Sequence, residues 1–167
     1  LKACAPGDRA YIANAYFLPT GALKHLKTAL IDAAQRGVDV RVLTNSEQGT
    51  DLPAVNHACL LELDALLAAG VRVFERTGDR TMHTKAASFG GQVATVGSWN
   101  MDNRSASLNS EDAAVIYDPT FADEVEAMIA RDMDDDVAAE LTRDDVRQRA
   151  HAAGRQATMA SLFSDLM

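Results

Sequence analysis

The sequence predicts an α/β fold, specifically an α/β/α sandwich in which helices flank a mixed β-sheet. Two observations lead to this expectation. Through residue 75, short strand-like segments alternate with longer segments of helical periodicity. A glycine pair then separates two further strand-like segments. The first pattern favours parallel crossover units and the second an antiparallel hairpin, so the predicted sheet contains both kinds of pairing.

The first half of the chain reads as strand, helix, strand, helix, strand. The elements are a strand at 10–17, a helix from Leu23 to Gly37, a strand at 38–44, a helix from Pro53 to Gly70 and a strand at 71–75. Both helices repeat leucine or alanine every three or four residues, and each ends at a glycine, as helices often do. In the second strand, Val38, Val40 and Val42 alternate with other residues and should share one face.

The second half is predicted to contain three more strands followed by helices. Segments 84–89 and 92–96 should form a hairpin around Gly90-Gly91, which is a two-residue turn signal, and 112–118 another strand. Helices are expected over 119–167, with a break near the acidic run. Residues 1–9 read as the remnant of a truncated helix, and we therefore expect a single domain over 1–167 that is part of a longer protein.

Composition limits the classes of function. The chain has 167 residues, 47% of them apolar and 24% charged, which is typical of a globular domain. It contains no apolar run of about 20 residues and no signal-peptide pattern. The net charge is −8, and residues 118–145 alone contribute −9. This acidity disfavours a nucleic-acid surface but allows a local site for a small anion. Cys4 and Cys59 show neither metal-ligand spacing nor a disulfide framework.

His83 and Lys85 are two positions apart in a segment that reads as a strand. Residues at i and i+2 of a strand point to the same face, so two cationic groups should lie side by side. Such a pair on an apolar segment is unfavourable unless an anion lies between them. Ser98 and Asn100 repeat this spacing at the end of the next strand, and the Gly90-Gly91 hairpin should bring all four side chains together.

These four side chains suit chemistry on a phosphodiester. An imidazole can act as nucleophile or acid, an ammonium can stabilise negative charge, and hydroxyl and amide groups can donate hydrogen bonds. Glu111 opens the next strand, and its carboxylate could bind the far nitrogen of the His83 ring and fix the tautomer. His25, His57 and His151 lie on helices and are better explained as structural or solvated residues.

The chain resembles the phospholipase D superfamily in the motif H-x-K-x4-D-x6-G-S-x-N, matched by His83, Lys85 and residues 97–100. The segments NAYFLPTGALKHLKTALIDAAQRGVDVRVLTNS, TDLPAVNHACLLELDALLAAGVRVFE and NMDNRSASLNSE resemble the carboxy-terminal half of bacterial cardiolipin synthases. One position departs from the motif, because Gly90 replaces the aspartate. That aspartate mainly supports the site, so its loss bears on local geometry more than on chemistry.

The resemblance implies a phosphatidyltransferase or phosphodiesterase that works through a phosphohistidine without metal or cofactor. A phospholipid such as phosphatidylglycerol is the implied substrate, and the implied location is the periphery of a bacterial cell membrane. His83, Lys85, Ser98, Asn100 and Glu111 are the implied catalytic residues, with His83 as general acid. The implied substrate-binding residues near the pocket rim are Tyr16, Arg104 and Asn109.

Family members use two copies of the motif, and this chain has one. The second copy is expected from a missing amino-terminal half or from a second identical chain. Two alternatives stay open: a homodimeric endonuclease of the same superfamily, and a catalytically silent half that serves as an interaction module. The acidic composition disfavours the endonuclease, and the joint presence of the five motif residues disfavours the silent half.

Overall fold

The structure, a computed structural model, describes residues 1–153, apart from the side chains of Ala54, Val55, His57, Leu61 and Ala153. Its first elements are β1 (Arg9–Asn14), the 3-10 turn η1 (Gly21–Leu23), α1 (Lys24–Gln35), β2 (Asp39–Asn45), α2 (Pro53–Ala68) and β3 (Arg72–Arg76). The elements that follow are β4 (Lys85–Phe89), β5 (Val93–Gly97), α3 (Asn103–Ser107), β6 (Ala113–Ile116), α4 (Pro119–Arg131), β7 (Ala138–Glu140) and α5 (Arg143–Ala153).

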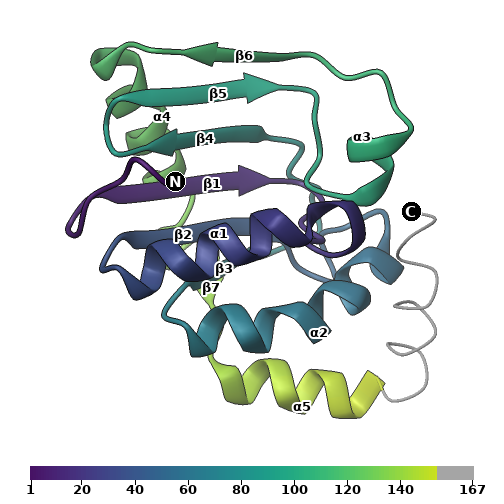
Figure 1. The fold of residues 1–167 in the computed structure, drawn as a ribbon. Coiled ribbons are helices and arrows are strands. Elements are labelled where there is room, and N and C mark those ends of the chain that lie inside the picture. Colours follow the sequence, from purple (N-terminus) through teal and green to yellow (C-terminus); the bar gives the residue numbers. More distant parts are fainter. Residues whose placement is uncertain (154–167) are drawn as a thin grey trace.

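The described strands form one mixed sheet in the order β6-β5-β4-β1-β2-β3-β7. β1, β2 and β3 are parallel, and the remaining neighbours pair antiparallel. Helices α1 and α2 cover one face of β1–β3, α4 lies behind β4 and β5, and α5 packs along α2 (Figure 1). The predicted α/β/α sandwich with a mixed sheet is confirmed.

The two faces of the sheet carry separate cores because side chains alternate along each strand. Val38, Val40 and Val42 share the face covered by α1 and α2, as the alternating pattern predicts. On the opposite face, Leu43 packs with side chains of α4, among them Ile129. β1 is buried from its second residue onward, so its polar last residue, Asn14, also lies in the packed interior.

The expected helix at residues 1–9 is wrong, because residues 1–8 form turns. The backbone N–H groups of Cys4 and Asp8 each donate to a carbonyl three residues earlier, and no longer helix follows within this segment. Pro6 has no backbone N–H, and Gly7 adopts a φ of 91°, which is outside the helical region.

The sequence analysis missed one strand within 119–167. Between α4 and α5, where only a break between helices was expected, Ala138–Glu140 forms β7 and pairs antiparallel with β3. Three residues are too short for alternation to be recognised, and the pairing is supported by an ion pair between Arg72 and Glu140. The part of the helices predicted over 119–167 that follows residue 153 lies outside the described residues.

Candidate active site

The motif residues meet at one edge of the sheet. Lys85 opens β4 directly opposite Asn14, the last residue of β1, and His83 lies in the segment just before β4. β5 returns antiparallel to β4, so Ser98 and Asn100, which follow β5, come back to the same edge. The hairpin therefore brings both motif segments to the same edge, although of these four residues only Lys85 lies in a strand.

The hairpin turn depends on its glycines. Gly90 and Gly91 have φ values of 62° and 61°, in the left-handed region that favours glycine. The backbone N–H of Gln92 donates to the carbonyl of Phe89 and closes the turn. The motif's aspartate position is thus part of a type of turn in which glycine has a conformational advantage.

Lys85 lies against the backbone of His83. Its Nζ donates to the His83 carbonyl oxygen at 3.0 Å, and the His83 side chain is exposed. Burial lowers the pKa of the Lys85 ammonium, and the nearby carboxylates of Glu111, Asp102 and Asp51 partly oppose that change. A partly desolvated cation beside an accessible imidazole is suited to binding an anionic group.

Glu111 organises Ser98 and not the imidazole. Its carboxylate accepts hydrogen bonds from the hydroxyls of Ser98 at 2.5 Å and Ser105 at 2.9 Å, and from the Asn109 amide at 3.1 Å. These bonds, that of Ser98 foremost, lower the pKa of Glu111. Within residues 1–153 it makes no hydrogen bond to His83, so that expectation is wrong. The carboxylate bonds to these three neutral donors instead.

Asn100 has an unusual environment. Its side-chain oxygen is buried, and no described group donates a hydrogen bond to it. Buried acceptors are nearly always paired, so an unpaired one at a candidate site indicates a place where a donor outside the described residues belongs.

The three predicted substrate-binding residues divide into two groups. Arg104 and Asn109 are exposed, and the Arg104 guanidinium approaches the Asn109 side-chain oxygen at 3.4 Å, beside Glu111. Tyr16 is buried and its hydroxyl donates to Asp51 at 2.5 Å. Burial, together with this bond, raises the pKa of Tyr16 to about 12, so the hydroxyl stays protonated. Tyr16 is therefore a packed residue bonded to Asp51, whereas Arg104 and Asn109 lie at the surface beside Glu111.

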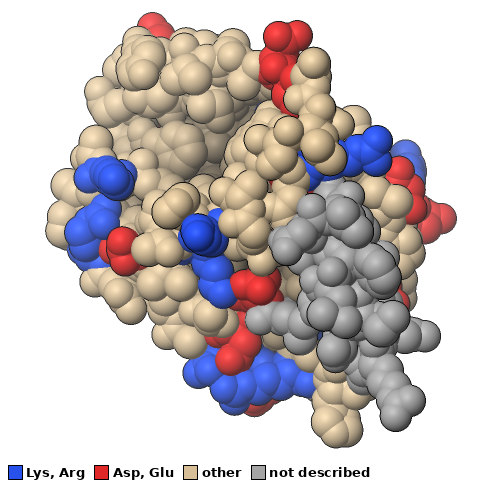
Figure 2. Space-filling view, turned by 45° about the vertical axis from the view of Figure 1, so that its right-hand side comes forward, with Lys and Arg blue, Asp and Glu red and all other residues tan. Residues whose placement is uncertain are grey.

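An apolar groove begins beside Lys85 and runs over β4 and β5, on the same face of the sheet as α1. Its volume is about 230 Å³, and it is lined by Leu26, Phe89, Thr95, Trp99 and Met101 among others. In Figure 2 the upper part of the molecule, where Figure 1 has β4–β6, carries few charged side chains. Val115 and Tyr117, on and just after the edge strand β6, are 51% and 81% exposed.

Sequence reasoning missed two buried asparagines, Asn14 and Asn45, which end β1 and β2 and bond to the backbone beside the motif. The available signal was their position, because polar residues that end buried parallel strands commonly face a binding site. Within the described part of the chain, no group of three His, Cys, Asp or Glu residues could hold a metal ion. No helix there is long and apolar enough to cross a membrane.

Comparisons with known proteins agree with this geometry. The family model "Cardiolipin synthase, PLD-like domain" matches residues 2–133. Cardiolipin synthase A of Pseudomonas entomophila is 36% identical over 159 residues, which are 95% of this chain and 32% of that protein. Cardiolipin synthase B of Salmonella typhi is 42% identical over 110 residues, which are 66% of this chain and 25% of that protein.

Solved structures show the same fold. The phospholipase D family member Nuc from Salmonella typhimurium gives a TM-score of 0.64 at 18% identity, over 81% of this chain and 83% of Nuc. Phosphatidylserine synthase from Haemophilus influenzae gives 0.70 at 16% identity, over 97% of this chain and 42% of that protein. This chain spans about a third of the curated relatives it matches. It belongs to the phospholipase D superfamily, in the family of the cardiolipin synthase phospholipase D-like domain.

Proposed function

We propose that this chain is one half-site of a cardiolipin synthase-like phosphatidyltransferase or phosphodiesterase. The observation that carries the proposal is the meeting of His83, Lys85, Ser98 and Asn100 at one sheet edge, beside an apolar groove. The anion-binding groups fit a phosphodiester, and a phospholipid such as phosphatidylglycerol combines that group with apolar chains. The similarity to cardiolipin synthases supports this substrate class.

The proposed reaction has two displacements at phosphorus. A histidine nitrogen attacks, a P–N bond forms, and the P–O bond to the leaving alcohol breaks. A second histidine gives that alcohol its proton, then takes a proton from the acceptor, whose oxygen displaces the first histidine. We assign the acid role to His83. Lys85 stabilises charge on the phosphoryl oxygens, and the Asn100 oxygen, to which no described group donates, can accept a hydrogen bond from the acceptor alcohol or from the second half.

A single imidazole cannot stand on both sides of phosphorus, so a second motif must complete the site. We propose that it lies in a part of the protein beyond this chain, which spans a third of its relatives. The groove and the exposed Val115 and Tyr117 offer an apolar face for that half. Peripheral contact with a bacterial membrane follows from the substrate, and the net charge of −8 disfavours nucleic acid.

The test measures phosphatidylglycerol turnover by this chain alone and together with the segment that supplies the second motif, with chelator present. We expect turnover only in the assembled protein, and a fall of about 10²–10⁴-fold for His83→Ala. His25→Ala, which removes an exposed histidine from α1, is the matched control and should keep full activity. Equal turnover by a strictly monomeric chain would refute the two-histidine account, and turnover by a homodimer on DNA would favour the endonuclease.

A further inference from the structure

Asn45, the last residue of β2, holds the peptide that precedes His83. Its side chain is 2% exposed, and its Oδ1 accepts the Met82 backbone N–H at 2.8 Å. Its Nδ2 donates to the Met82 carbonyl at 3.0 Å and also to the carbonyl of Ala15 at 3.0 Å. One amide group thus binds both polar backbone groups of the residue next to the candidate acid.

Asn14, the last residue of β1, holds the backbone around Asn100 in the same way. It is 1% exposed, its Nδ2 donates to the Trp99 carbonyl at 3.2 Å, and its Oδ1 accepts the Met101 N–H at 3.0 Å. Trp99 and Met101 are the two neighbours of Asn100. The same oxygen also accepts the N–H of Tyr16 at 3.3 Å, so Asn14 links three points of the site.

Both motif segments need such support because they lie outside the sheet ladder. The residues before β4 and after β5 belong to no strand. A side-chain amide carries one acceptor oxygen and two donor hydrogens, so it can complete hydrogen bonds that a neighbouring strand would otherwise make. A hydroxyl has too few donors for this pattern, and a carboxylate has none when ionised.

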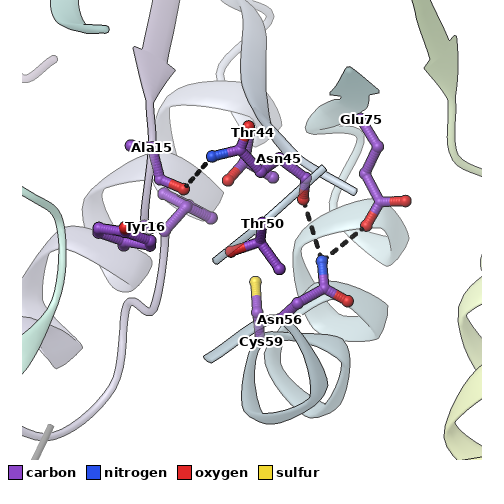
Figure 3. A pocket seen from close by; sticks show the side chains of 9 residues that line it. Ala15, Tyr16, Thr44, Asn45, Thr50, Asn56, Cys59 and Glu75 are labelled. Atoms are coloured by element: carbon purple, nitrogen blue, oxygen red, sulfur yellow. Dashed lines mark hydrogen bonds between the residues drawn. The ribbon is translucent and has the colours of Figure 1, made fainter. Parts of the chain in front are cut away.

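Asn45 is in turn held from behind. Asn56, on α2, donates from Nδ2 to the Asn45 carbonyl at 3.0 Å and to Glu75 at 3.1 Å. Figure 3 shows this series of contacts from Ala15 through Asn45 and Asn56 to Glu75. Arg149 of α5 forms an ion pair with Glu75 at 2.6 Å and closes the series. Asn45 is therefore fixed from both sides in a buried network, as an orienting residue must be.

We propose that Asn45 and Asn14 are positioning residues of the active site: Asn45 sets the His83 imidazole through Met82, and Asn14 sets the Asn100 carboxamide through its two neighbours. This inference rests on the proposed function. Neither side chain is placed against substrate, so each acts through another residue. Loss of either should slow the chemical step while leaving phospholipid binding nearly unchanged.

The decisive variant is Asn45→Asp in the assembled protein. Aspartate keeps the shape and an acceptor for the Met82 N–H but loses both Nδ2 donors and faces two carbonyl oxygens. We expect kcat for phosphatidylglycerol to fall about 10–100-fold, the range for residues that orient catalytic groups, with KM changed less than twofold. The NMR signals of the His83 ring should also move.

Leu43→Ala is the matched control, because Leu43 is fully buried in the same strand, two residues earlier, on the α4 side. It should lower stability without moving kcat, KM or the His83 signals in the folded protein. If Asn45→Asp behaves like Leu43→Ala, the inference is wrong. If Asn45→Asp does not fold, Asn14→Ser provides the test on its own. Its kcat should fall with KM nearly unchanged, and the NMR signals of the Asn100 side chain should move.

His83→Ala separates this inference from the proposed function. Full activity in that variant overturns the proposed function, whereas the response of the His83 ring signals to Asn45→Asp still tests the positioning role. Loss of activity in His83→Ala, together with wild-type kcat and unmoved ring signals in Asn45→Asp, overturns the positioning role and leaves the proposed function intact.

Discussion

Replacing Gly90 by aspartate would restore the family motif, yet the structure predicts that it destabilises this chain. Gly90 has a φ of 62°, and a non-glycine residue there costs about 1 kcal/mol. A Cβ at Gly90 would lie 3.3 Å from Oδ2 of Asp8. Two carboxylates at such a half-exposed place repel by about another 1 kcal/mol. We therefore expect Gly90→Asp to reduce the free energy of unfolding by about 2 kcal/mol.

Urea unfolding of five chains separates the two causes: wild type, Gly90→Ala, Gly90→Asp, Asp8→Asn and the double variant. Gly90→Ala should lose only the backbone part, about 1 kcal/mol. In the double-mutant cycle, Asp8→Asn should recover about 1 kcal/mol of the Gly90→Asp loss, because it removes the charge repulsion but not the strain.

Activity provides a separate readout of the same substitution. The turn is five residues from Lys85 along β4, or roughly 17 Å, so turnover by the folded assembled enzyme should stay within tenfold. In the unfolding experiments, a Gly90→Asp chain as stable as wild type would refute the structural reasoning. A loss of stability that Asp8→Asn does not reduce would refute it as well. A gain in activity of several hundredfold would favour a decayed, silent half.

Three further perturbations test the site. Gly97→Ala would place a Cβ onto the carbonyl oxygen of the residue before β6, and we expect a loss of about 1–3 kcal/mol in urea unfolding and weaker activity. Glu111→Gln removes a charge that raises the pKa of Lys85, so the alkaline limb of the pH–rate profile and the NMR titration of Lys85 should move to lower pH. Tyr16→Phe removes the hydroxyl bond to Asp51 and should cost about 1–2 kcal/mol at neutral pH. Because the folded pKa of Tyr16 is raised to about 12 from 10.0, wild type should lose this stabilisation between pH 10 and 12, and Tyr16→Phe should show no such loss. Equal pH dependence of the two proteins in this range would contradict the assignment.

The fold could be predicted from local patterns because most of its elements are long enough to show a period. Val38, Val40 and Val42 identified a strand and its core face correctly, and the Gly90-Gly91 pair located the hairpin. The patterns failed where an element is short or its partner is distant in sequence. β7 has three residues and is a strand only because β3 lies beside it. Residues 1–8 have helix-compatible alanines, but Pro6 and Gly7 prevent the helix.

For the candidate site, the sequence predicted where the motif segments lie in the fold but not the hydrogen bonds among their side chains. The hairpin signal places the segments that carry His83, Lys85, Ser98 and Asn100 beside the neighbouring ends of β4 and β5, although only Lys85 lies in a strand. It cannot tell which of several donors reaches Glu111, because α3 folds back and brings two donors near that carboxylate. The roles of the buried asparagines were missed for the same reason: the motif segments that they hold are 37 to 87 residues away in sequence.

The charges around Lys85 bear on the proposal that a second motif completes the site. Its ammonium is partly buried, and it interacts electrostatically with three carboxylates, those of Glu111, Asp102 and Asp51. Each carboxylate accepts a hydrogen bond from a neighbouring group, so the three acids order the residues around Lys85. They also give this region a negative electrostatic potential. A phosphodiester adds a further negative charge, and a single lysine cannot offset that set in a partly desolvated place. A second motif would bring another ammonium and another imidazole to the same phosphorus. The electrostatics around Lys85 therefore support the proposed second motif, as does the proposed need for a nucleophile and an acid on opposite sides of phosphorus.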